Sequence, residues 1–116
     1  MKILIVDDIE ETRFCLKKQL ESAGHSVVGE AADLDATLRV YRETKPDFVL
    51  LDMTLEKQDG LTILKALRQL DPSAKVVVLS ANEMASIQRA ALQLGATGYL
   101  VKPVNEQKML SLLSSK

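Results

Sequence analysis

Short apolar runs recur along the chain, and four of the five lead directly into a reactive polar residue. Runs of this length, separated by segments with helical periodicity, are typical of buried parallel strands. The residues that follow four of these runs are Asp7-Asp8, Asp52, Ser80 and Lys102. The fifth run, around Val27-Val28, has no such ending. Because parallel strands all point the same way, we expect the polar residues at their ends to gather at one edge of a sheet.

Helical periodicity fills each interval between the apolar runs. Asp33 is expected to cap the second helix, and Gly24 to take a left-handed conformation after the first. The pattern predicts helices at 9–23, after Asp33, from Leu61 to Asp71-Pro72, from Asn82-Glu83 to Gly95, and from about Asn105. Five strands alternating with five helices favour a doubly wound α/β fold with a parallel sheet, in which residues 1–116 form one domain.

The composition narrows the class of protein. A chain of 116 residues with 47% hydrophobic residues suffices for one globular domain. Its 15 basic and 16 acidic residues give a net charge of −1, so nothing marks it for direct binding to nucleic acid or to a membrane surface. We find neither a leader pattern nor an apolar stretch of the ~20 residues that a membrane span requires. A cytoplasmic protein is therefore expected.

The single cysteine cannot form an internal disulfide. Helical spacing places Cys15 on the same side of the first helix as Thr12, Leu16 and Leu20. We therefore expect Cys15 to be a buried small hydrophobic residue and not a nucleophile.

Three carboxylates at neighbouring strand ends repel one another unless a cation lies among them. Asp7, Asp8 and Asp52 offer hard oxygen ligands, which suit Mg²⁺ better than zinc. Lys102 and the hydroxyl of Ser80 would add donors for phosphate oxygens, and a carboxylate can accept a phosphoryl group. Simpler interpretations remain open: a helix cap for Asp7-Asp8, an isolated ion pair between Asp52 and Lys102, and a cap or turn residue for Ser80.

Four motifs in order carry a resemblance to a known family. They are Ile5-Val6-Asp7-Asp8, Leu51-Asp52 with Asp59-Gly60, Leu79-Ser80-Ala81, and Gly-Ala-Thr-Gly-Tyr-Leu-Val-Lys-Pro at 95–103. On these residues the chain resembles response-regulator receiver domains of two-component systems, above all the stand-alone chemotaxis type, over essentially its whole length. The resemblance implies a flavodoxin-like sheet with strand order 2-1-3-4-5.

The resemblance also implies roles for individual residues. Asp52 would be the phosphoacceptor and would bind Mg²⁺ directly, together with Asp8 and the backbone carbonyl of Thr54, whereas Asp7 would act mainly through a water. Ser80, Lys102 and the backbone N–H of Ala81 would hold the phosphoryl oxygens.

Further implied features lie around this centre. Tyr99 would be the switch aromatic that turns inward when Ser80 moves, although a surface tyrosine without a role is the alternative. The Lys102-Pro103 bond would be cis. Thr54 and Asn82 would tune the lifetime of the acyl phosphate. Glu56 stands where the family usually has a proline that shapes the loop carrying Thr54, and it would add a negative charge near the metal.

The implied function is a phosphorylation-dependent signalling switch. Its phosphoryl donor would be a histidine kinase or a histidine phosphotransfer protein, and its output a target protein or a domain of a longer chain. Such a protein promotes its own aspartyl phosphorylation and dephosphorylation but is not a dedicated enzyme. Some family members dimerise when phosphorylated.

Three other functions are alternatives. One is a receiver-fold interaction module that takes no phosphate, although such modules usually lose one of the five polar strand-end residues. Another is a Mg²⁺-dependent aspartyl phosphatase of the haloacid dehalogenase class, which wants a second acid where this chain has Thr54. A flavin-binding flavodoxin would need a Ser/Thr/Gly-rich phosphate loop, where this chain has Asp7-Asp8-Ile9-Glu10.

Overall fold

Five strands form one parallel sheet in the order β2-β1-β3-β4-β5 in the computed structural model, as predicted. The structure describes residues 1–52, 60–80, 85–102 and 105–114. The strands are β1 (Lys2–Val6), β2 (Ser26–Ala31), β3 (Phe48–Asp52), β4 (Val76–Ser80) and β5 (Gly98–Val101). The helices are α1 (Glu10–Ser22), α2 (Leu34–Thr44), α3 (Gly60–Leu70), α4 (Ala85–Gln93) and α5 (Glu106–Ser114). Strands and helices alternate along the chain, which confirms the doubly wound α/β prediction.

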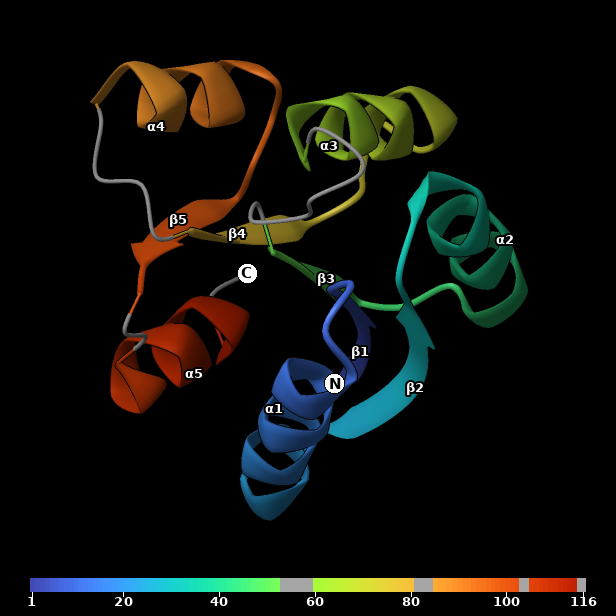
Figure 1. Ribbon diagram of the computed structural model, residues 1–116, viewed down its shortest axis with the longest axis vertical. Coiled ribbons are helices and arrows are strands. Elements are labelled where there is room, and N and C mark those ends of the chain that lie inside the picture. Colours follow the sequence, from blue (N-terminus) through green and yellow to red (C-terminus); the bar gives the residue numbers. More distant parts are fainter. Residues whose placement is uncertain (53–59, 81–84, 103–104, 115–116) are drawn as a thin grey trace.

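The sheet divides the core into two layers. Helices α1 and α5 cover one face, and α2, α3 and α4 cover the other (Figure 1). Successive side chains of a strand point to opposite faces. In β1, Ile3 and Ile5 therefore pack on the α1 and α5 side, while Leu4 and Val6 pack on the side of the other three helices. This double burial explains why the strands appear in the sequence as unbroken apolar runs.

Several predicted helix ends are confirmed. The side chain of Asp33 accepts a hydrogen bond from the amide of Ala36 at 2.8 Å, so it caps α2. Asn105 accepts from the amide of Lys108 at 3.1 Å before α5. Gly24 follows α1 with a φ of +90°, a conformation that glycine adopts without a Cβ clash.

One expectation about α1 is wrong, and one alternative interpretation fails. Cys15 is exposed, because it shares a helix row with Glu11 and Lys18 that faces solvent, whereas the buried positions of α1 are Leu16 and Leu20. The cap interpretation of Asp7-Asp8 also fails, because Ile9 is the N-cap of α1 and the cap makes no side-chain hydrogen bond. The error over Cys15 arises because the sequence alone did not fix how α1 is rotated against the sheet.

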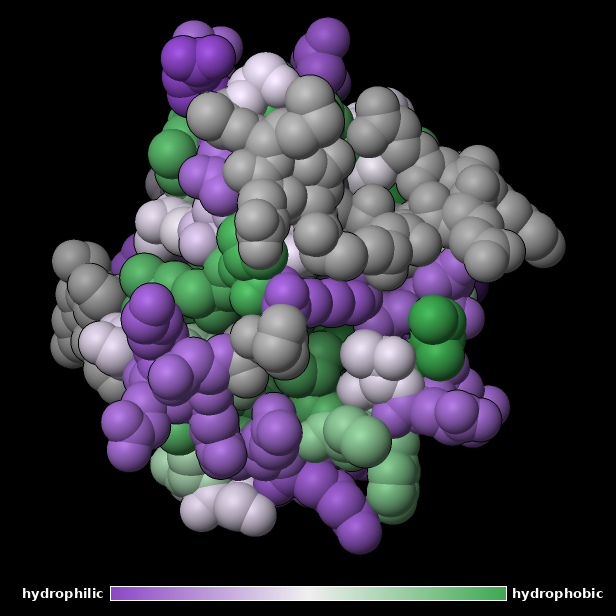
Figure 2. Space-filling view, turned by 60° about the vertical axis from the view of Figure 1, so that its left-hand side comes forward, coloured by the Kyte–Doolittle hydropathy of each residue, from purple (hydrophilic) through white to green (hydrophobic). Residues whose placement is uncertain are grey.

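Hydrophilic and hydrophobic side chains are interspersed over the face shown in Figure 2, in keeping with a net charge of −1. None of the helices within the described ranges combines the length and the apolar character that a bilayer crossing demands.

Candidate phosphoryl site at the carboxyl edge of the sheet

The register of the sheet brings the predicted residues to one edge. Val6 lies beside Leu51, so Asp7 and Asp52 follow at neighbouring strand ends. Ser80 lies beside Val101, and the amide of Lys102 donates to the carbonyl of Ser80 at 2.7 Å. Residues far apart in the sequence therefore meet because their strands are parallel and end at the same level.

Lys102 forms an ion pair with Asp52 through its ammonium group and Oδ2 of the carboxylate. The Asp52 side chain is only 1% exposed, whereas that of Lys102 is 29% exposed. A carboxylate this deeply buried is costly unless a charged partner compensates it. The contact confirms that the two residues come together, and by itself it also fits the simpler interpretation of an isolated ion pair.

The environment of Asp7 is not explained by an isolated ion pair between Asp52 and Lys102. Asp7 is fully buried, and its Oδ1 accepts a hydrogen bond from the amide of Ile9 at 2.8 Å. Its Oδ2 is buried without a hydrogen-bond partner among the residues that the structure describes. Burial raises the pKa of the Asp7 carboxyl from 3.8 to about 7, and the neighbouring Asp52 carboxyl adds to the rise, while Lys102 opposes it. The edge thus holds more negative charge than Lys102 alone compensates.

These features fit a hard divalent cation. Oδ2 of Asp7 is buried and has no hydrogen-bond partner in the part of the chain that the structure describes, and Oδ1 of Asp8 is also shielded from solvent. Carboxylate oxygens with room for water are the ligands that Mg²⁺ prefers. Within the described ranges, no three Asp, Glu, His or Cys side chains are already arranged as metal ligands.

Ser80 and Tyr99 lie on the last two strands of the sheet. Ser80 ends β4 and is 2% exposed. Tyr99 lies on β5, beside Val78 in the sheet, and packs half-buried against the core layer of α2, α3 and α4. The two residues therefore belong to adjacent, paired strands of the sheet.

Some predictions lie outside the described residues and stay predictions. They concern Thr54, Glu56, Ala81, Asn82 and the Lys102-Pro103 bond.

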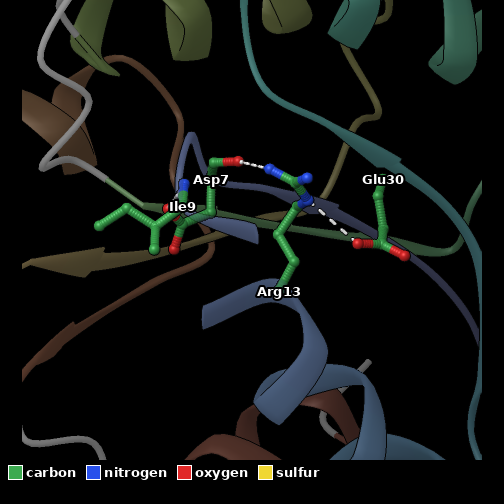
Figure 3. Close-up of polar contacts among 4 residues, drawn as sticks. All are labelled: Asp7, Ile9, Arg13 and Glu30. Carbon is green, nitrogen blue, oxygen red and sulfur yellow. Dashed lines mark hydrogen bonds and ion pairs between the residues drawn. The ribbon is translucent and has the colours of Figure 1, made fainter. Parts of the chain in front are cut away.

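Arg13 is a residue that the sequence reasoning missed. Its guanidinium donates to the main-chain carbonyl of Asp7 at 2.6 Å and forms an ion pair with Glu30 at 3.0 Å (Figure 3). A signal was present, because Arg13 is a cation three residues before Leu16 and therefore on the core-facing side of α1.

Comparisons with known proteins indicate one family. A model of the response regulator receiver domain matches residues 3–114. Chemotaxis protein CheY of Thermotoga maritima is 34% identical over 113 residues, which cover 97% of this chain and 94% of that protein. Protein CcdB of Bacillus subtilis shows the same identity and the same coverage.

Solved structures add two close matches. A CheX-CheY complex with BeF3 and Mg²⁺ from Borrelia burgdorferi has a TM-score of 0.92 at 32% identity and covers 99% of this chain and 87% of that one. A response regulator from Burkholderia pseudomallei, with a phosphorylated aspartic acid, a calcium ion and citrate, has a TM-score of 0.88 at 30% identity; the match covers 98% of this chain and 66% of that one.

The chain therefore belongs to the response regulator receiver domain family, and it is the receiver domain of a CheY-like response regulator. Receiver domains are typically signalling switches of two-component systems and not dedicated enzymes, and they work with kinases and downstream targets.

Proposed function

We propose that this protein is a switch in a two-component phosphorelay that accepts a phosphoryl group on Asp52 in the presence of Mg²⁺. The observation that carries the proposal is the buried carboxyl edge, where Asp7 and Asp52 lie together and Lys102 contacts Asp52. The relatives support it, since one solved receiver is described with a phosphorylated aspartic acid and another with BeF3 and Mg²⁺.

The transfer step follows from the chemistry of the edge. An Asp52 carboxylate oxygen attacks the phosphorus of a phosphohistidine in line, the new O–P bond forms as the P–N bond breaks, and the leaving imidazole takes a proton from solvent. Lys102, already within contact of Asp52, neutralises charge on the phosphoryl oxygens. Bound Mg²⁺ would supply further charge neutralisation, with Asp8, Asp52 and the Thr54 carbonyl holding it directly and Asp7 through water. Ser80 and the Ala81 amide would donate to the remaining phosphoryl oxygens.

The phosphoryl donor is expected to be a histidine kinase or a histidine phosphotransfer protein. The same site promotes its own phosphorylation, and water later removes the phosphoryl group at a rate that Thr54 and Asn82 tune.

Incubation with Mg²⁺ and acetyl phosphate, followed by intact-protein mass spectrometry, tests the acceptor. We expect a mass gain of one phosphoryl group that Asp52→Asn abolishes and that excess EDTA suppresses. No gain in the wild-type protein, or an equal gain in Asp52→Asn, contradicts the proposal; the former result favours an interaction module that takes no phosphate.

The output follows from the place of Tyr99. Phosphate at Asp52 draws Ser80 inward, Tyr99 changes rotamer, and the surface of α4, β5 and α5 changes shape for a target, an output domain or a second copy of the chain. One phosphate can shift such an equilibrium only if the two shapes differ by a few kcal/mol.

The chain allows a direct test of this switch. It contains no tryptophan and two tyrosines, so Tyr99 is the only tyrosine in a Tyr41→Phe background. Tyrosine fluorescence should change when Mg²⁺ and BeF3 are added, and it should stay constant when Asp52→Asn is introduced as well. Constant tyrosine fluorescence in the Tyr41→Phe protein with Asp52 intact would show that Tyr99 takes no part in the switch.

A further inference from the structure

The strand-end loop that carries Asp8 is held at two points. The carbonyl oxygen of Asp7 accepts from Arg13 at 2.6 Å. Two residues later, the amide of Ile9 donates to Oδ1 of Asp7 at 2.8 Å. The carbonyl of Asp7 and the N–H of Asp8 share one planar peptide group. The contact with Arg13 therefore fixes the orientation of the peptide group before Asp8. The contact with the Ile9 amide fixes the backbone just after Asp8.

Arg13 is itself held in place by a third element. Its Nε contacts Glu30 on β2 at 3.0 Å, while its Nη1 reaches the loop, so one planar guanidinium joins α1, β2 and the loop after β1 (Figure 3). The Arg13 side chain is 17% exposed and that of Glu30 is 36% exposed. The ion pair is thus too exposed to count for much as a source of stability. Its geometry matters more, because a guanidinium presents several donors in a fixed fork.

The charge arrangement supports the same conclusion. The guanidinium points a donor at a neutral carbonyl and directs its other contact away from the site toward Glu30. Glu30 therefore holds one donor of the guanidinium while a second donor holds the loop carbonyl.

We propose that Arg13 is a positioning residue that, together with Glu30, orients the Asp7-Asp8 loop for Mg²⁺ binding. This inference rests on the proposed function, since it concerns the same metal site. Loss of a group that orients metal ligands without touching the metal typically lowers metal affinity by about 10–100-fold. Arg13 acts through one backbone carbonyl, so we expect an effect of about tenfold.

Calorimetric titration with MgCl2 measures the first consequence. Arg13→Ala should weaken Mg²⁺ binding by about tenfold. Arg39→Ala, which removes an exposed arginine of α2, should leave it unchanged. Arg13→Lys should fail to restore the affinity, because one ammonium group cannot span both the Asp7 carbonyl and Glu30. Full rescue by Lys would show that charge and not geometry matters, and would overturn the proposal.

Phosphorylation by acetyl phosphate supplies the second measurement. At low Mg²⁺ the Arg13→Ala protein should be phosphorylated more slowly than wild type, and saturating Mg²⁺ should restore the rate, because Arg13 touches no reacting atom. A merely structural role would not give this dependence on Mg²⁺ concentration. A defect that persists at saturating Mg²⁺ contradicts the inference.

Amide hydrogen exchange without metal separates the inference from the proposed function. The Ile9 amide should exchange faster in Arg13→Ala than in wild type, while amides at the centre of β3 stay protected. If the wild-type protein takes no phosphoryl group, the proposed function is wrong. The exchange rate of the Ile9 amide in Arg13→Ala still shows whether Arg13 holds the loop. If wild type is phosphorylated but Arg13→Ala matches it in Mg²⁺ affinity and amide exchange, only the inference is wrong.

Discussion

Asp7 is a buried acid with one oxygen bound to its own loop and the other directed into an acidic site. Its Oδ1 accepts a hydrogen bond from the Ile9 amide, and its Oδ2 is buried. Such a group destabilises the folded protein whenever it is ionised without a compensating cation. The residue therefore links function to stability, because the carboxylates that would bind a cation cost free energy when none is bound.

This cost predicts a pH dependence in EDTA. The pKa of Asp7 is raised by burial and by Asp52 to about 7 in the folded state, against 3.8 ordinarily. The stability that protonated Asp7 provides is fully present below about pH 4 and is lost as the pH rises toward 7. Asp7→Asn should remove this decline, and saturating Mg²⁺ should reduce it in wild type. Denaturant unfolding across this pH range measures it, and a flat wild-type profile would refute the assignment.

Tyr41 and Asp71 form a second polar contact, on α2 and just after α3. The tyrosine hydroxyl donates to the Asp71 carboxylate at 2.8 Å. Burial raises the pKa of Tyr41, and the hydrogen bond from Tyr41 lowers the pKa of Asp71. The pKa of Asp71 is thus lower in the folded protein than its ordinary value of 3.8. The stability that this pair contributes is therefore present above pH 3.8, and it is lost as the pH falls through the pKa of Asp71 in the folded protein.

Tyr41→Phe should therefore lower the free energy of unfolding modestly at neutral pH, and by less than a truncation in the core. The difference between the two proteins should shrink in acid, once Asp71 is protonated. Urea unfolding at several pH values measures both effects. A difference that stays constant into the acid range would mean that the lost hydroxyl acts through something other than Asp71.

At the scale of helices and strands, the sequence predicted most boundaries because the local signals are strong. Asp33 and Asn105 cap helices through their own side chains, and these contacts need no tertiary information. Cys15 was misplaced because its burial depends on how α1 is turned against the sheet, which residues Leu16 and Leu20 decide by packing. Helix caps were thus predictable from the local sequence, whereas the rotation of α1 against the sheet was not.

The glycines that follow α1 and α4 allow a matched prediction. Gly24 and Gly95 both have positive φ, at +90° and +99°. A Cβ on Gly24 would meet nothing within 4 Å, whereas one on Gly95 would lie 2.4 Å from Nε of Arg68. Arg68 also donates to the carbonyl of Ala74 at 2.8 Å, so it cannot move away without losing that contact.

Gly24→Ala should thus cost only the backbone strain, about 1 kcal/mol, and Gly95→Ala should cost more. Replacing Arg68 by Ala in the Gly95→Ala protein should recover the steric part of that cost but not the strain. Chemical denaturation of the single and double variants gives these differences. Equal costs at the two glycines would show that Arg68 yields freely.

For the whole molecule, parallel strands made the site predictable, because any residue that follows a strand must come to the same edge. Asp7, Asp52, Ser80 and Lys102 were placed correctly by this rule alone. The link from Arg13 to Glu30 was not foreseen, since it depends on side chains that cross between α1 and β2. Contacts that follow from topology were predictable, while contacts that follow from side-chain reach needed the structure.

Because the two core layers share one sheet, we expect them to unfold as one cooperative unit. Leu20 on α1 and Leu64 on α3 are both fully buried, on opposite faces of shared strands. Truncating either to Ala should lower the free energy of unfolding by about 2–5 kcal/mol. Leu92→Ala, at a side chain that is 51% exposed, should change it little.

Each variant should still unfold in one transition, because neither layer can separate while its strands also carry the other. Far-ultraviolet circular dichroism follows all helices together. Tyrosine fluorescence reports Tyr41 and Tyr99, which both pack on the α2, α3 and α4 side. The two signals should give the same midpoint even in Leu20→Ala, whose cavity lies on the other face. Separate midpoints would show that the layer under α1 and α5 melts first and that the sheet does not couple the two faces.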